Sequence, residues 1–295
     1  MAISRREFLM RASGTAAGAA FAGRLLAAAK GAAGLHVGVC DWSIGKGGRV
    51  EALEVAARIG LEGVQISPDG AKAKLSYATK KVQQAYKAAV KSTGMRIASV
   101  GLTVTNGCPL ATDKRGVAWL EQTVDAAHAL GCTATLIAFF GPGDLYDPKT
   151  KKLSAKAVDA VVEKFKAAAP RAKAKGVVLG LESWLSAREN LKILERVGSD
   201  AVGVYYDIAN STARGYDVPA EIRLLKSRIC EFHFKDNKGL FGAGQVKVEP
   251  IAKAIEEIGY KGWLILEQAH GDAATYFRKN AAYVRKTFGL KAPKK

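Results

Sequence analysis

The sequence predicts an α/β fold, a single (β/α)8 barrel that follows an N-terminal signal segment. First, short apolar runs alternate with amphipathic stretches of helical period, as in a parallel sheet covered by helices. Second, the predicted barrel at residues 35–290 has the length of one such domain, about 250 residues. Third, the last four apolar runs end in polar residues, and functional side chains gather at the carboxyl ends of barrel strands.

The first half of the barrel is predicted to contain four strands with helices between them. Gly60 and Gly131 mark helix ends and Gly94 marks a turn, because glycine tolerates the left-handed conformation found there. The predicted strands are residues 35–42, 61–67, 95–102 and 132–140, and the predicted helices are residues 50–59, 82–92 and 118–130.

The second half repeats this plan with four more strands. The predicted strands are residues 176–182, 202–207, 228–233 and 263–267, and the predicted helices are residues 154–175, 186–197, 219–225, 248–258 and 273–288. Pro170 is expected to break or kink its helix, because proline donates no backbone hydrogen bond. A doubly wound sheet would have a similar pattern, but eight strands with polar ends favour a closed barrel.

Residues 1–30 are predicted to be a twin-arginine export signal. Arg5 and Arg6 stand in the segment SRREFL, an alanine- and glycine-rich apolar stretch follows, and Ala27 to Ala29 offer a cleavage site. The alternative is an ordinary basic amino terminus followed by an alanine-rich helix. No segment is long enough to span a bilayer of about 30 Å, so we expect a periplasmic protein without a membrane span after signal removal. Residues 291–295 form a basic tail.

The chain is strongly basic, with a formal net charge of +18 at pH 7. Such an excess attracts nucleic acids or phosphorylated ligands when it is concentrated on one face. Here the lysines are scattered over the predicted helices without interleaved aromatic residues, which is typical of a solvated surface. The segment GKGG at Gly45 to Gly48 lacks the spacing of a phosphate-binding loop. We expect no nucleic-acid partner, and a homo-oligomer is compatible with the sequence.

Four potential metal ligands close the last four apolar runs, VVLGLE, VGVYYD, CEFH and WLILE. They are Glu182, Asp207, His233 and Glu267, and successive members are 25, 26 and 34 residues apart. Each gap accommodates one helix, one strand and their loops. Because the carboxyl ends of barrel strands meet at one mouth, we expect these side chains to lie close together.

Three carboxylates and one imidazole form a mixed oxygen and nitrogen donor set. Such a set suits Mn²⁺, Mg²⁺ or Co²⁺ better than a structural Zn²⁺, which favours cysteine and histidine. A divalent ion polarises a sugar carbonyl, so that the proton on the adjacent carbon becomes acidic. Glu182 and Glu267 are then suited to be the catalytic acid and base. The sequence thus predicts a metal-dependent sugar, keto-sugar or polyol isomerase or epimerase that works through an enediolate.

The segments around these residues resemble the sugar phosphate isomerase/epimerase superfamily, the xylose-isomerase-like TIM barrels. The matching segments are GLES, YYDIAN, FHFKDNKG and GYKGWLILE, and the resemblance covers roughly residues 35–290. It implies that the matching Glu, Asp, His and Glu bind the metal and that the two glutamates exchange protons. The chain departs from the ketose epimerases at Lys238 and Gly239, where those enzymes have an arginine that contacts the substrate.

Four further residues are predicted to bind the substrate. Asn210 occupies a place where ketose epimerases often have a substrate-contacting histidine, and Lys235 shares a strand face with His233. Trp42 and His270 follow the first and last predicted strands, so both are expected to line the barrel mouth. Packing, charge neutralisation and solvent exposure are the structural alternatives for these residues.

Three other functions fit parts of the same pattern. A lyase or dehydratase acting on a keto-sugar, keto-glycoside or inosose would use the same site. A carbohydrate-binding barrel without catalysis is also compatible, since a fold does not determine a function. An endonuclease-IV-like nuclease shares this barrel but requires a three-zinc site with several histidines, and the chain has four histidines in all.

Replacing Arg5 and Arg6 by lysine tests the export signal. We expect the R5K/R6K variant to stay in the cytoplasmic fraction of a Gram-negative host while the wild type reaches the periplasm, because the pathway reads the arginine pair. Immunoblots of cell fractions measure the distribution. Arg11→Lys, in the same segment but outside the pair, is the matched control. Equal export of the double variant and the wild type would contradict the prediction.

Overall fold

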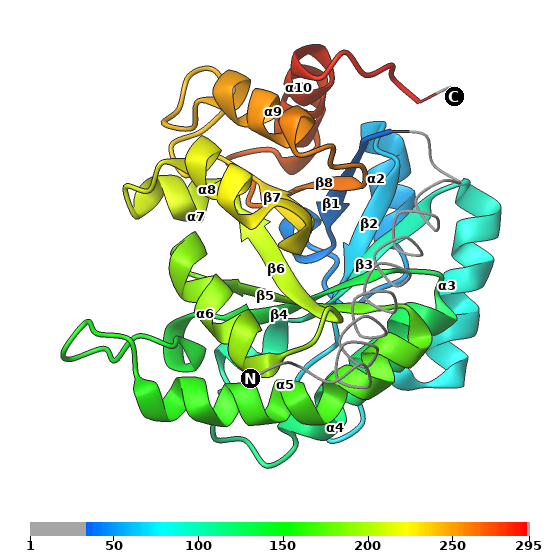
Figure 1. Cartoon of the computed structure of the whole chain (residues 1–295). Helices are drawn as coiled ribbons and strands as arrows, with labels where there is room; N and C mark the ends of the chain where they lie inside the picture. Colours follow the sequence, from blue (N-terminus) through cyan, green and yellow to red (C-terminus); the bar gives the residue numbers. More distant parts are fainter. Residues whose placement is uncertain (1–33, 294–295) are drawn as a thin grey trace, which may run out of the picture.

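A computed structural model describes residues 34–293 as a closed barrel of eight strands in the order β1 to β8 (Figure 1). Neighbouring strands all pair in parallel, and β8 pairs with β1 to close the barrel. The strands are β1 (His36–Cys40), β2 (Gly63–Ile66), β3 (Arg96–Leu102), β4 (Ala134–Phe139), β5 (Val178–Ser183), β6 (Val202–Asp207), β7 (Ile229–Phe234) and β8 (Trp263–Leu266). The predicted TIM-barrel fold is confirmed, and the predicted signal of residues 1–30 lies outside the described residues.

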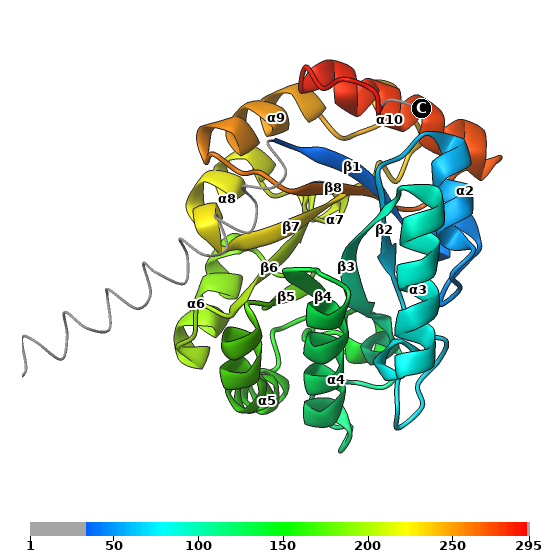
Figure 2. The ribbon, with the colours of Figure 1, turned by 90° about the vertical axis from the view of Figure 1, so that its right-hand side faces the viewer.

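Helices surround the strands on the outside of the barrel (Figure 2). The α-helices are α2 (Ala52–Ile59), α3 (Lys80–Thr93), α4 (Gly116–Ala129), α5 (Ala155–Lys175), α6 (Ala187–Val197), α7 (Ile208–Ala213), α8 (Val218–Leu225), α9 (Val248–Glu257) and α10 (Ala273–Thr287). The 3₁₀ turns are η2 (Trp42–Ile44), η3 (Ser76–Ala78), η4 (Thr103–Asn106), η5 (Gly141–Gly143) and η6 (Lys226–Arg228). Across residues 34–293, none of these helices is long and apolar enough to cross a membrane.

Two helical features differ from the sequence prediction. Helix α5 continues through Pro170 instead of breaking there, because Pro170 lies on the exposed face, where water can bond the carbonyl that lacks its helical partner. Helix α7 was not predicted, because it is short and follows β6 directly. Asp207 starts it as the N-cap, and its side chain accepts hydrogen bonds from the amides of Ala209 and Asn210.

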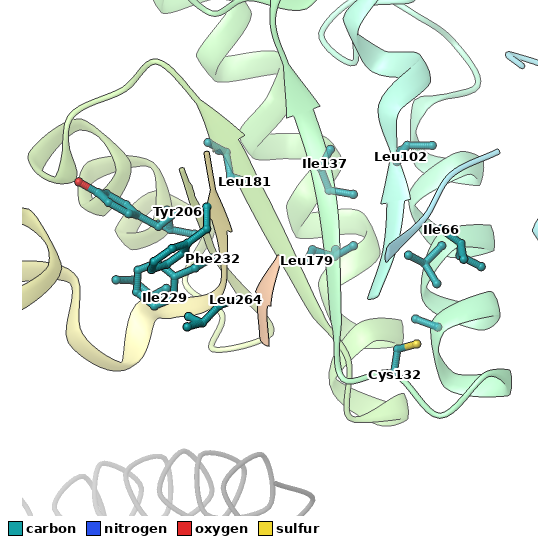
Figure 3. Packing of buried hydrophobic residues seen from close by; sticks show 14 of the residues in the cluster. Ile66, Leu102, Cys132, Ile137, Leu179, Leu181, Tyr206, Ile229, Phe232 and Leu264 are labelled. Carbon is teal, nitrogen blue, oxygen red and sulfur yellow. The ribbon is translucent and has the colours of Figure 1, made fainter. Parts of the chain in front are cut away.

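The main hydrophobic core lies between the outer strand faces and the helices. Figure 3 shows part of it, including Ile66, Ile137, Leu179 and Phe232, all of which are fully buried. Inside the barrel the apolar contacts are fewer, and they fall into two small clusters. One contains Cys40, Ala98 and Ile265, and the other contains Leu136, Ala138 and Tyr205. The barrel interior therefore leaves room for buried polar side chains beneath the mouth.

Gly180 tests how tightly the barrel interior is packed. A Cβ atom there would lie 2.6 Å from both Cys230 Sγ and the carbonyl oxygen of Thr135, and the latter is backbone that moves little. We expect Gly180→Ala to lower the free energy of unfolding by about 1–3 kcal/mol. Gly107→Ala is the matched control, because Gly107 has a negative φ and a Cβ there would have no neighbour within 4 Å. Thermal unfolding measures both, and equal Tm values would contradict this packing.

Candidate metal centre and active site

The four strand-end residues converge on one point at the barrel mouth. Glu182 lies in β5, Asp207 ends β6, His233 lies in β7 and Glu267 follows β8, and one ligand atom from each lies within 4.8 Å of the others. His233 Nδ1 is central: it lies 2.8 Å from Glu182 Oε1 and 3.5 Å from Glu267 Oε2. It also lies 3.9 Å from Asp207 Oδ2. All but Glu267, which is partly exposed, are buried.

Asp207 is oriented by the start of α7. Its Oδ1 accepts hydrogen bonds of 2.8 Å from the amides of Ala209 and Asn210, which turns Oδ2 toward the cluster. Oδ2 is buried and has no hydrogen-bond donor, although Lys235 Nζ lies 2.6 Å away, at an angle unsuited to a hydrogen bond. A buried carboxylate oxygen without a donor is uncommon and indicates a missing ligand, such as a cation.

A chain of hydrogen bonds below the mouth determines which nitrogen of His233 faces the carboxylates. Ser99 Oγ and Tyr205 Oη both donate to Glu231 Oε1, at 2.6 and 2.8 Å. Each hydroxyl has one proton, so Gln65 Nε2 must donate to both oxygens, at 2.9 and 2.8 Å. Gln65 Oε1 then accepts from His233 Nε2 at 2.7 Å. Nε2 therefore keeps its proton, and Nδ1 remains as the ligand nitrogen.

Lys235 is the cation that neutralises this cluster in the structure. Its Nζ donates a hydrogen bond to Glu267 Oε2 and forms an ion pair with Asp207, and the residue is only 8% exposed. Burial lowers the pKa of Lys235, but Asp207 and Glu267 outweigh it and raise the pKa well above its usual range. Burial raises the pKa of Glu267 too, yet Lys235 and His233 hold it at about 2.

His233 and Glu182 show that positive charge is still in demand. Burial lowers the pKa of His233, but Glu267 and Glu182 outweigh this effect and raise it to about 9. The pKa of Glu182 is raised, chiefly by burial, although His233 partly opposes the shift. Three carboxylates and one lysine leave two uncompensated negative charges when the imidazole is neutral. A divalent cation balances them, so the four residues are a candidate binding group for such an ion.

A second candidate group, Cys40 with His233 and Glu267, fits a metal less well. Burial raises the pKa of the Cys40 thiol well above its usual range, so the thiolate that a metal requires is disfavoured. Cys40 also faces Nε2 of His233, at 3.4 Å, and that nitrogen is occupied by its bond to Gln65. We therefore place the candidate centre on the Nδ1 side.

The structure brings three of the four predicted substrate contacts to this site. Trp42 Nε1 donates to Glu267 Oε1 at 3.2 Å, Lys235 bonds Glu267, and Asn210 contributes its backbone amide to Asp207. His270 is different: its side chain is exposed, and its ring packs 5.5 Å from that of Tyr276. The substrate-binding roles of all four residues stay predictions.

Several residues that support the site were not found from the sequence. Gln65, Ser99, Tyr205 and Glu231 are buried and form the bonded chain beneath His233. Glu231 had a visible signal, since it stands two residues before His233 and shares its strand face. Asp236 is fully buried and accepts from the amides of Lys238 and Val246, so it shapes the loop after β7.

An aromatic wall rises beside Glu182. Phe140 and Trp184 each stand one residue past the last register pair of β4 and β5, Phe139 with Ser183. Their rings meet edge to face with centroids 5.4 Å apart, and both side chains are partly exposed. Such a wall at the barrel mouth offers an apolar face to a sugar ring.

The chain belongs to the xylose isomerase-like TIM barrel family, whose model matches residues 53–287. It is 27% identical over 245 residues to "Putative L-ribulose-5-phosphate 3-epimerase SgbU" of Escherichia coli (strain K12), over 74% of this chain and 82% of that protein. A D-psicose 3-epimerase structure matches with a TM-score of 0.72 at 17% identity, over 86% of this chain and 99% of the other. An L-ribulose 3-epimerase structure matches with a TM-score of 0.70 at 19% identity, over 86% and 95%. A 3-keto-D-glucoside 4-epimerase from E. coli matches with 0.68 at 14%, over 85% and 99%.

Lys235→Met tests the charge balance of the cluster. Removing the ammonium leaves the buried carboxylates without their cation, so we expect a loss of about 3–5 kcal/mol of stability in the presence of a chelator. Mn²⁺ should restore much of this loss, because a bound ion supplies the missing charge. Lys238→Met, an exposed lysine three residues further along, is the matched control. A wild-type Tm for Lys235→Met in chelator would contradict this account.

Proposed function

We propose that this protein is a metal-dependent isomerase or epimerase of a sugar or closely related polyol. The observation that carries the proposal is that Glu182 and Glu267, from non-adjacent strands, both face His233 Nδ1 in one cluster, at 2.8 and 3.5 Å. The named relatives are epimerases of sugars, which supports an enzyme of this class. No comparably placed pair of acids is needed for simple sugar binding.

The donor set supports a divalent ion such as Mn²⁺, Mg²⁺ or Co²⁺, held by Glu182, Asp207, His233 and Glu267. When bound, the ion supplies Lewis-acid polarisation of the substrate carbonyl. One glutamate takes the proton from the carbon beside that carbonyl, and the other returns a proton from its own side, through an enediolate. Trp42 holds Glu267 Oε1 by a hydrogen bond and so limits the positions of that carboxylate.

The positions of the histidines do not support a three-zinc nuclease. His233 is the one histidine in the cluster, whereas His36 bonds Glu62, His128 lies 3.0 Å from the carbonyl oxygen of Lys175 and His270 contacts Tyr276. We also propose that the enzyme works in the periplasm after twin-arginine export. The segment SRREFL supports this location, and it favours unphosphorylated sugars as substrates, because sugar phosphates are mainly cytoplasmic.

Proton exchange in deuterated water tests this function. In an NMR screen of sugars and keto-sugars with Mn²⁺ present, we expect a carbon-bound proton to exchange in at least one substrate as the epimer or isomer forms. Glu182→Gln and Glu267→Gln should each slow exchange by about 10²–10⁴-fold, because each removes one acid or base. Metal content measured on the same samples separates lost chemistry from lost metal.

Glu195→Gln, an exposed glutamate on α6, is the matched control and should exchange at the wild-type rate. Wild-type rates in folded, metal-loaded Glu182→Gln and Glu267→Gln would contradict the proposal. A product that has lost a hydroxyl group would instead identify a lyase or dehydratase that uses the same two glutamates.

A further inference from the structure

A second cleft opens beside the metal-binding cluster. Its volume is about 410 Å³, within the range of small-molecule sites, about 300–1,000 Å³. Its walls come from the loops that follow β4, β5 and β6, so it lies on the same face of the barrel as the strand-end residues. The side chains that matter here are Asp144, Tyr146, Lys151, Trp184 and Arg214.

Trp184 joins this cleft to the barrel mouth. It stands two residues beyond Glu182 in sequence, and its ring packs edge to face against Phe140 in the aromatic wall. The same residue lines the cleft. A group bound in the cleft is therefore a neighbour of a group bound over Glu182, with Trp184 between them.

The cleft is held in shape before any ligand binds. Tyr146 Oη donates to Glu189 at 2.8 Å, and Tyr216 Oη donates to the carbonyl oxygen of Trp184 at 3.1 Å. The guanidinium of Arg214 lies over the Tyr146 ring, 4.9 Å from its centroid. Fixed aromatic walls lower the entropy lost when a ligand binds.

The chemistry of the lining matches a neutral polyhydroxylated ring. Asp144 and Asp147 offer acceptors, while Lys151 and Arg214 offer donors, so the two acids offset the two bases. Trp184 and Tyr146 add aromatic surface for the apolar face of a sugar. A phosphate group would favour an excess of positive charge, and the two aspartates remove that excess.

We propose that this cleft binds a second sugar ring, so that the substrate is a glycoside of two linked rings instead of a free monosaccharide. The reacting ring lies over the metal-binding cluster, and the other ring lies beyond Trp184 in the cleft. The identity of the reacting ring rests on the proposed function, whereas the cleft is defined by its own residues.

Isothermal titration of the Mn²⁺-loaded protein tests this proposal. The probes are maltose, cellobiose and sucrose, compared with glucose, fructose and glucose 6-phosphate. We expect at least one disaccharide to bind about tenfold or more tightly than its component monosaccharides. Arg214→Ala should raise the Kd of that disaccharide about tenfold, because one charge-assisted hydrogen bond is lost, and leave monosaccharide binding unchanged.

Arg188→Ala is the matched control, since Arg188 is an exposed arginine on α6 that does not line the cleft. Equal affinities for disaccharides and monosaccharides would overturn the proposal, and so would an equal loss in both variants. Glucose 6-phosphate binding that alone depends on Arg214 would show a phosphate site instead. Because titration needs no turnover, Arg214-dependent disaccharide binding without proton exchange would contradict the proposed function and leave the cleft assignment standing.

Discussion

The burial of three carboxylates at one barrel mouth is the constraint on which the rest of the site depends. Glu182, Asp207 and Glu267 cannot all stay ionised in a buried place without positive charge close by. The fold supplies part of it through Lys235, which contacts two of the three. The remaining demand appears in the raised pKa of His233 and in the donor-free Oδ2 of Asp207. A divalent cation satisfies both.

The barrel interior makes this arrangement specific. Glu231 fixes the direction of the hydrogen bonds through Ser99, Tyr205 and Gln65, and Gln65 in turn fixes the protonated nitrogen of His233. Burial raises the pKa of Glu231 to about 7, and the two hydroxyls that donate to it moderate that shift. A polar chain of this kind inside a barrel is stable only when every member is satisfied. Its function here is to present Nδ1 to the carboxylates.

Much of this was predictable from local patterns. Apolar runs ending in Glu182, Asp207, His233 and Glu267 identified strands β5 to β8, because parallel strands place their carboxyl ends together. Gln65 could not be found in this way, since it bonds a histidine 168 residues away, and only closure of the barrel brings the two together. Register shifts in the pairing of β2 with β3 and of β6 with β7 also changed which side chains face inward, and alternation alone does not locate such shifts.

The helix errors have similar causes. Pro170 breaks a helix in isolation, but its place on the solvent face of α5 lets the helix continue. Helix α7 was missed because one turn and a half has too little periodicity to detect, and because Asp207 was interpreted as a metal ligand alone. Its second role, as a helix N-cap, is what aims the ligand oxygen.

A crystal of the protein soaked in Mn²⁺, with anomalous diffraction data, tests the central claim most directly. The account predicts one anomalous peak per chain, bonded to oxygens of Glu182, Asp207 and Glu267 and to Nδ1 of His233, with Lys235 Nζ moved away from Asp207. A peak on the Nε2 side of His233 near Cys40, or no peak among the four residues at saturating Mn²⁺, would contradict it.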